Sequence, residues 1–209
     1  MILDIFQPDS GQIEIFGGSM TEDKKNLIGY LPEERGLYQE IPLNRCLTFL
    51  ATLKGMPEND IQGILDDYLR QFDLYDVRYK KVKELSKGMQ QKAQLISTLI
   101  HNPQLVIIDE PFTSLDPVNT EMVKDMLELK RDEGKAIIMS THQMNQVEEL
   151  CDRILLIDHG KNVLYGRLNE IRRRYTGNAV LVRPAGDAPL EALGGTLHVP
   201  GVDEVTVHN

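Results

Sequence analysis

The amino-acid sequence predicts an α/β fold with a parallel sheet at its core. Segments of strand character alternate with segments whose apolar residues recur at three and four positions, as βαβ units require. The run 105–109, Leu-Val-Ile-Ile-Asp, is apolar, rich in β-branched residues and bounded by prolines, which is typical of a parallel strand buried on both faces. Directly after it, Asp116 and Pro117 provide the cap and the first residue of a helix.

The elements before this strand follow from periodicity and turn residues. We expect the chain to begin in the tail of an apolar helix at 1–6, followed by turn residues and a short strand at 12–16. A second strand is expected at 27–31, where Pro32 stops it. The segments 44–54 and 60–72 have the apolar spacing of amphipathic helices, and with 75–83 they form a helical insert before the helix 88–101.

The elements after this strand are predicted in the same way. The helix that starts at Pro117 runs to about Glu133 and ends at Gly134. A strand at 136–140, a helix at 143–150 and a hairpin at 154–164, turning at 159–161, follow. Composition changes after Arg174, so we expect the start of a small C-terminal α+β domain at 175–209, with strands at 179–183 and 202–207.

Length, charge and hydropathy exclude several functional classes. The 209 residues carry a net charge of −9, which argues against a nucleic-acid partner, because phosphates need a basic face. No apolar run approaches the roughly 18 residues of a membrane span, and the first residues lack the basic region of a signal peptide. Cys46 and Cys151 have no metal-ligand spacing and are expected to be buried thiols in a reducing compartment. The chain is therefore predicted to be cytoplasmic.

Two acids at the end of the buried strand form the principal candidate site. Asp109 and Glu110 would lie at the carboxyl edge of the sheet, where ligands of α/β proteins bind. Mg²⁺ prefers one or two carboxylates beside phosphate oxygens, and a second carboxylate can orient an attacking water. The alternative is that both acids merely cap the strand.

A second candidate is the stretch Leu85-Ser86-Lys87-Gly88-Met89 at a helix start. A serine and a glycine at a helix N-terminus offer a hydroxyl and backbone N–H groups to an anion. The alternative is a plain helix start with Ser86 as the N-cap.

These stretches together resemble the ATP-binding cassette (ABC) family of transport ATPases, whose fold is a P-loop NTPase-like parallel sheet with a helical subdomain insert. The resemblance covers about residues 1–170, with the helical subdomain at about 42–88. Five motifs occur in the family's order: Leu31-Pro32-Glu33 at the Q-loop, Leu85 to Met89 at the signature loop, Leu105 to Glu110 at the Walker B strand, Ser114-Leu115-Asp116 at the D-loop, and Ser140-Thr141-His142 at the switch histidine.

The resemblance assigns roles to individual residues. It implies that Asp109 helps to hold Mg²⁺, that Glu110 is the catalytic carboxylate, and that His142 contacts the γ-phosphate of ATP. Ser86 and Gly88 would grip the γ-phosphate of ATP bound to the opposite subunit, and Asp116 would bridge to that subunit. A helix-capping or buried role remains open for His142, and a capping role for Asp116.

Three departures from the family pattern stand out. Glu33 replaces the usual glutamine, with a simple surface acid as the alternative, and Lys87 and Met89 replace a common glycine and glutamine. These changes resemble an export-type subgroup, which often carries a small domain after the cassette. The third departure is that no G-x-x-x-x-G-K-S/T (Walker A) occurs in the chain, so the backbone cradle and lysine for the phosphates are missing. We therefore expect an N-terminally truncated copy that is inactive alone.

The expected function is that of the ATP-hydrolysing subunit of an ABC-type export system. Its expected partners are a second cassette, in a homodimer, and an integral membrane permease that holds it peripherally at the inner face of the cell membrane. The alternative is a nucleotide-independent remnant or regulatory binding module. Soluble cassette proteins of DNA repair or translation are disfavoured, because the chain has neither long coiled coils nor two cassettes and is acidic.

Overall fold

The computed structural model describes residues 1–34 and 36–175. The chain divides into two compact units, Met1–Cys151 and Asp152–Asn209, and the second is described as far as Tyr175. The first unit holds the sheet, the helical insert and every candidate site residue. None of the helices in the described ranges is long and apolar enough to cross a bilayer.

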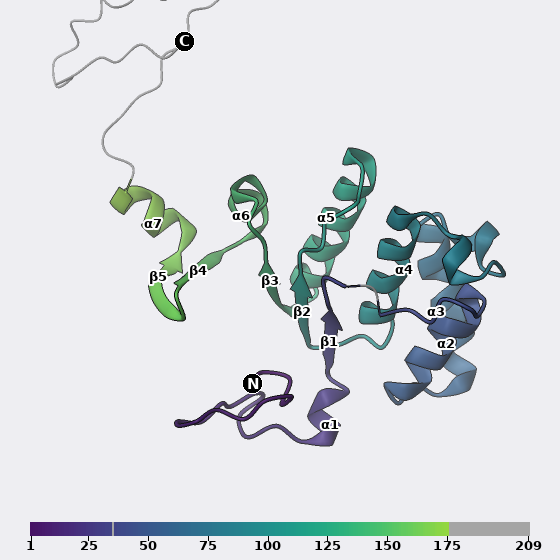
Figure 1. Cartoon of the computed structure of the whole chain (residues 1–209), viewed down its shortest axis with the longest axis horizontal. Helices are drawn as coiled ribbons and strands as arrows, with labels where there is room; N and C mark the ends of the chain where they lie inside the picture. Colours follow the sequence, from purple (N-terminus) through teal and green to yellow (C-terminus); the bar gives the residue numbers. More distant parts are fainter. Residues whose placement is uncertain (35, 176–209) are drawn as a thin grey trace, which may run out of the picture. The chain divides into compact units, whose positions relative to one another are not determined.

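The core of the first unit is a parallel three-stranded sheet in the order β1-β2-β3 (Figure 1). Its strands are β1 (Ile28–Leu31), β2 (Leu105–Asp109) and β3 (Ala136–Ser140). In the register, Leu31 lies opposite Ile108, and Asp109 lies opposite Ser140. All three strands therefore end at one edge of the sheet, and the loops that follow them lie side by side. The α/β class and the parallel arrangement are confirmed.

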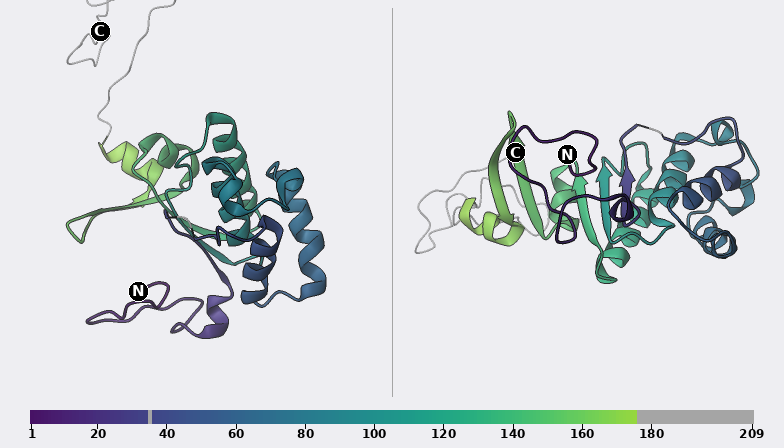
Figure 2. Two further views of the ribbon diagram at one scale, coloured as in Figure 1. Left: turned by 45° about the vertical axis from the view of Figure 1, so that its right-hand side comes forward. Right: turned by 90° about the horizontal axis from the view of Figure 1, so that it is seen from below.

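The helical insert lies beside the β1 edge of the sheet, as both views in Figure 2 and the view in Figure 1 show. It consists of α2 (Leu43–Leu53), α3 (Glu58–Gln71) and two 3₁₀ turns, η1 (Tyr75–Val77) and η2 (Val82–Glu84). Leu43, Leu47 and Leu65 are among its fully buried side chains, and α4 (Lys87–Leu99) joins this core. The apolar spacing in the sequence thus corresponds to one shared hydrophobic core.

The remaining helices of the first unit follow β2 and β3. Helix α5 (Pro117–Asp132) begins at the predicted Asp116–Pro117 cap and ends just before Gly134, whose φ of +85° is a left-handed conformation that glycine adopts without strain. Helix α6 (Met144–Leu150) follows β3. Neither cysteine forms a disulfide, and Cys46 is buried as expected, whereas Cys151 is only half-buried.

The first 26 residues differ from the prediction. Residues 1–6 form a turn, closed by a bond from Asp4 N to Met1 O, and residues 12–16 form no strand. The apolar residues of this segment, among them Ile5 and Phe6, are exposed, so no packed face stabilises a helix there. A short helix that was not predicted, α1 (Glu22–Lys25), is capped by Thr21.

The described part of the second unit is an antiparallel hairpin with one helix. Strands β4 (Arg153–Asp158) and β5 (Lys161–Arg167) turn at Gly160, which has a φ of +72°, and the predicted hairpin is confirmed. Helix α7 (Leu168–Tyr175) packs Ile171 against Gly166 of β5. The strands predicted at 179–183 and 202–207 lie outside the described residues.

Candidate functional site

Asp109 and Ser140 end two neighbouring strands and join them at the carboxyl edge of the sheet. Asp109 is the last residue of β2, and its Oδ1 accepts a hydrogen bond from the Ser140 hydroxyl at the end of β3. The backbone N–H of Glu110 donates to Ser140 O at 3.2 Å, which extends the sheet by one residue. These bonds fix where the β2 loop leaves the sheet.

Glu110 is held against the residues that follow β3. Its Oε1 lies 2.7 Å from Nδ1 of His142 and accepts the His142 backbone N–H at 3.0 Å. A carboxylate oxygen only accepts, so this contact requires the hydrogen on Nδ1. The Glu110 side chain is 14% exposed, whereas that of His142 is 79% exposed. Glu110 also has a φ of +48°, a left-handed backbone that is uncommon outside glycine and concentrates at functional sites.

A small polar network supports the second oxygen of Glu110. The hydroxyl of Thr141 lies 3.4 Å from Glu110 Oε2 and 3.4 Å from Gln146 Oε1, and it accepts the Gln143 backbone N–H at 3.1 Å. Gln146 is 4% exposed, and its amide donates to Gln143 Oε1 at 2.8 Å. The single hydrogen of the Thr141 hydroxyl is thus shared between Glu110 Oε2 and Gln146 Oε1, and the shorter contacts of Glu110 are those of its Oε1.

Ser86 and Gly88 form a second cluster, at the N-terminus of α4. Ser86 is the N-cap, since its hydroxyl accepts the Met89 backbone N–H at 3.2 Å. A Cβ on Gly88 would lie 3.5 Å from Ser114 O and 3.8 Å from a Leu115 methyl group, so this helix start packs on the loop between β2 and α5. Among the hydrogen bonds and ion pairs of the described residues, none joins this cluster to Asp109 or Glu110.

Asp116 has the capping role that its sequence context predicts. Its carboxylate accepts the backbone N–H of Asn119 at 3.0 Å and the side-chain amide of Asn119 at 2.5 Å. These two bonds, the backbone bond first, lower the pKa of Asp116 below its ordinary value. The carboxylate is nonetheless exposed and retains acceptor capacity for a further partner.

Glu33 is placed beside the site by the parallel register. It follows β1 by two residues, at the same edge of the sheet as Asp109 and Glu110, and its side chain is exposed. The carbonyl groups of its neighbours Pro32 and Glu34 both accept bonds from the Gln94 amide of α4. The chain thus holds the Glu33 loop through backbone groups and leaves the Glu33 carboxylate to solvent.

The carboxylates at this edge suit a magnesium–nucleotide complex. Mg²⁺ in nucleotide sites takes one or two protein carboxylates, and the substrate phosphates and water supply its other ligands. Asp109 offers such an oxygen at the end of β2. Within 1–34 and 36–175, no cluster of three or more His, Cys, Asp or Glu residues is placed to hold a metal ion by itself. The Asp109 carboxylate is therefore of the kind that Mg²⁺ takes beside phosphate oxygens.

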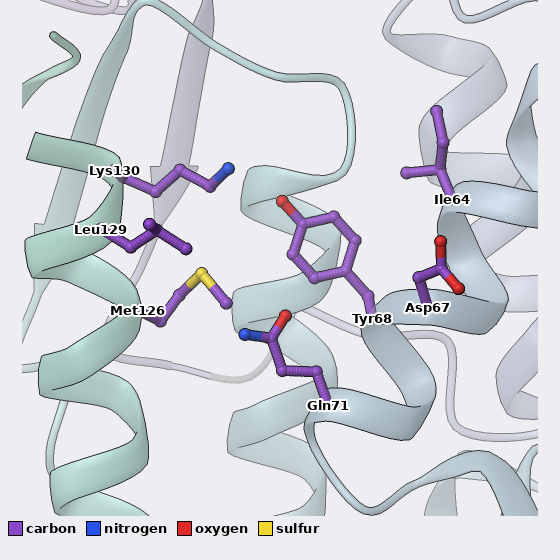
Figure 3. A pocket seen from close by; sticks show the side chains of 7 residues that line it. All are labelled: Ile64, Asp67, Tyr68, Gln71, Met126, Leu129 and Lys130. Carbon is purple, nitrogen blue, oxygen red and sulfur yellow. The ribbon is translucent and has the colours of Figure 1, made fainter. Parts of the chain in front are cut away.

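A pocket of about 250 Å³ lies away from these residues, between α3 and α5. Figure 3 shows Tyr68 and Gln71 of α3 projecting toward Met126, Leu129 and Lys130 of α5. Burial raises the pKa of the Tyr68 hydroxyl. None of the predicted site residues lines this pocket.

Comparison with known proteins agrees with this geometry. Residues 1–113 match the family model described as "ABC transporter". An uncharacterized ABC transporter ATP-binding protein of Alkalihalophilus pseudofirmus is 40% identical over 203 residues, which cover 97% of this chain and 74% of that protein. The uncharacterized ABC transporter ATP-binding protein YhaQ of Bacillus subtilis is 42% identical over 187 residues, or 90% of this chain and 63% of its own.

A solved structure described as the "ATP binding subunit of ABC transporter" superposes with a TM-score of 0.77 at 30% identity, and covers 83% of this chain and 74% of that one. This chain belongs to the ABC transporter ATP-binding family. The family consists of ATPases. The likeness to the solved structure confirms the P-loop NTPase-like fold expected from the motifs.

The predicted ABC site residues fall into three groups in the structure. Asp109, Glu110 and His142 come together at one sheet edge, Ser86 and Gly88 lie at the start of α4 with Asp116 on the adjoining loop, and Glu33 follows β1. The sequence did not single out Gln94 or Gln146, although both are buried polar residues in this part of the chain. The sequence carries no signal that marks them, because both stand in helices with several other polar residues.

Proposed function

We propose that this ABC chain is the ATP-hydrolysing subunit of an export system and couples hydrolysis in a dimer of cassettes to a membrane permease. The contact between Glu110 and His142 at the end of the sheet supports the catalytic part of this proposal. In the proposal, Glu110 accepts a proton from the attacking water, while His142 holds Glu110 and the γ-phosphate in place. Mg²⁺, held by Asp109 and the phosphates, would supply charge neutralisation.

The proposed dimer follows from the separation of the two clusters. The start of α4 carries Ser86 and Gly88 with exposed or half-exposed backbone, and no bond in the described chain ties them to the Glu110 cluster. In a head-to-tail dimer, each helix start would face the ATP of the other subunit and contribute N–H donors to the γ-phosphate. Asp116 would bridge between the subunits, because capping leaves it acceptor capacity.

The export assignment is supported by one relative that is named for export, and a second relative is named for linearmycin resistance. The linearmycin resistance ATP-binding protein LnrL of Bacillus subtilis is 29% identical over 214 residues, and the Nod factor export ATP-binding protein I of a Rhizobium strain is 31% identical over 184 residues. We propose a cassette at 1–170, with the helical subdomain at about 42–88 and the Glu33 loop as the permease docking surface, and an accessory domain at 175–209. The subunit would then lie peripherally at the inner face of the membrane.

The catalytic assignment is tested by Glu110→Gln in a chain extended at its N-terminus by a segment that carries G-x-x-x-x-G-K-S/T. ATP binding should persist, while turnover should fall by about 10²- to 10⁴-fold, since the amide cannot take a proton. Asp125→Asn, which neutralises an exposed acid on α5, is the matched control and should retain turnover. Turnover that survives Glu110→Gln would show that the base is misassigned.

A second candidate is a nucleotide-independent remnant or regulatory binding module, which the missing phosphate loop favours. The 209-residue chain is expected to bind ATP negligibly in calorimetry, because it has no loop to cradle the β- and γ-phosphates. Micromolar affinity would contradict this expectation. The two candidates separate in the extended chain, since only the ATPase proposal predicts hydrolysis there.

A further inference from the structure

The outer edge of β1 is covered by polar side chains instead of another strand. β1 lies at an edge of the described sheet, so carbonyl groups of alternate residues face away from β2. The first of them, Ile28 O, accepts from Lys54 Nζ at 2.9 Å and lies 3.2 Å from His101 Nε2. The second, Tyr30 O, lies 3.3 Å from the Thr98 hydroxyl, whose single hydrogen is shared with Gln94 O at 3.0 Å within α4.

These side-chain contacts with carbonyl groups form a ladder along the edge, and the ladder continues past the end of β1 at the Glu33 loop. Nε2 of Gln94 donates to Pro32 O at 3.2 Å and to Glu34 O at 3.1 Å. Gln94 and Thr98 are one helical turn apart on α4, so a single face of this helix satisfies successive carbonyl groups of the edge. The bonds of Gln94 are the part of the ladder that lies next to a predicted site residue.

Burial makes the Gln94 bonds specific. The residue is 3% exposed, and its Oε1 has no partner among the described residues. Turning the amide around would put Oε1 against two carbonyl oxygens, so the observed orientation is the one that can form both bonds. Pro32 is half-buried and Glu34 is exposed, and the Gln94 amide donates to the carbonyl groups of both, so its loss would remove one donor from each of two carbonyl groups.

Helix α4 packs closely against β1. A Cβ on Gly29 would clash with the backbone oxygen of Thr98 and lie 3.0 Å from its methyl group, so the strand touches the helix directly. The same helix begins at Ser86, eight residues before Gln94, which is about 12 Å along the axis. Gln94 therefore connects the Glu33 loop to the element that carries Ser86 and Gly88.

We propose that Gln94 is a positioning residue that clamps the Glu33 loop to α4, so that the loop and the signature segment Ser86–Gly88 shift together. The functional consequence of this clamp rests on the proposed function. A permease that displaces the Glu33 loop would also move the start of α4, which is proposed to grip the phosphate. The clamp itself is a property of the 209-residue chain. The clamp requires two N–H donors at residue 94, and an apolar side chain of similar size would not replace them.

The clamp is tested by Gln94→Met, which keeps the length of the side chain and removes both donors. Spin labels at Glu34→Cys and Lys87→Cys, two exposed positions, report the distance between the loop and the start of α4 in a Cys46→Ala/Cys151→Ala background. We expect a narrow distance distribution with Gln94 and a broad one with Gln94→Met. Thr98→Val, which removes the neighbouring rung at Tyr30 O, is the matched control and should keep the distribution narrow.

Hydrogen exchange on the same variants separates positioning from stability. Amides in 31–39 should exchange about tenfold faster or more in Gln94→Met, while those of β2 stay unchanged. If Gln94→Met does not fold, Gln94→Ala replaces it, because the smaller side chain creates no crowding. An unchanged distribution and unchanged loop exchange, or equal acceleration in β2, would overturn the clamp. Neither measurement uses nucleotide, so such a failure would leave the ATPase proposal standing.

Discussion

His101 makes the stability of the first unit depend on pH. It follows α4, and burial, reinforced by the positive charge of Lys54, lowers its pKa from 6.5 to about 4, although its bond with Ile28 O opposes the shift. Its Nδ1 is buried without a partner in the described chain. A proton on this ring would therefore add a charge that nothing in its surroundings accepts.

The magnitude follows from this pKa difference. As the pH falls, the unfolded chain binds the proton near 6.5, before the folded chain does near 4, so the contribution of His101 is complete above pH 6.5 and is lost between 6.5 and 4. At one pH unit above the folded pKa, the loss is about 2 kcal/mol, and below both pKa values it approaches about 3 kcal/mol.

The assay is urea unfolding of wild type and His101→Gln at pH 7.5 and pH 5.0. Glutamine keeps a donor for Ile28 O and does not titrate, so the variant should lose about 2 kcal/mol less than wild type between the two pH values. Thr98→Val, which changes a neighbouring side chain of α4 and removes no titratable group, is the control and should lose as much as wild type. Equal losses in wild type and His101→Gln would refute the buried, neutral state of His101.

Four further substitutions test the packing of the first unit by urea unfolding at pH 7.5. Gly29→Ala should prevent folding or cost several kcal/mol, because its Cβ meets the Thr98 backbone. Gly63→Ala in α3 is its control and should stabilise the unit by about 0.5–1 kcal/mol, because a Cβ there has open space. Equal effects of the two substitutions would contradict the close β1–α4 contact. Leu65→Ala should cost about 2–5 kcal/mol, since the side chain is fully buried, and a loss below 1 kcal/mol would contradict its place in the core. Ser86→Ala should cost about 1 kcal/mol through the lost N-cap, and no loss would show that the Met89 bond is dispensable.

The strand 105–109 and the helix after Asp116 could be predicted because their signals are local. A β-branched apolar run between prolines has few alternatives to a buried strand, and Asp116 bonds to a residue three positions away. The first residues were mispredicted for the opposite reason. Apolar residues at 1–6 resemble a helix face, but a short helix needs a packing partner, and Ile5 and Phe6 are exposed.

The motif order was enough to place Asp109, Glu110 and His142 in one site. Residues that follow neighbouring parallel strands must meet at the same edge, and the structure places His142 Nδ1 2.7 Å from Glu110 Oε1. The sequence could not show that the Thr141 hydroxyl lies within reach of both the other carboxylate oxygen and Gln146. Their bonds depend on side-chain directions that the strand order leaves open.

By itself, the sequence determined the α/β class, the family and the chemistry available at the sheet edge, because each depends on residue types at fixed short spacing. Only the tertiary structure decided how the edge of β1 is satisfied. Gln94 lies 60 residues from Glu34 along the chain, and its bond to that carbonyl exists because α4 packs directly on Gly29. Contacts of this kind depend on how closely two elements approach one another in space, and a local sequence pattern does not determine that separation.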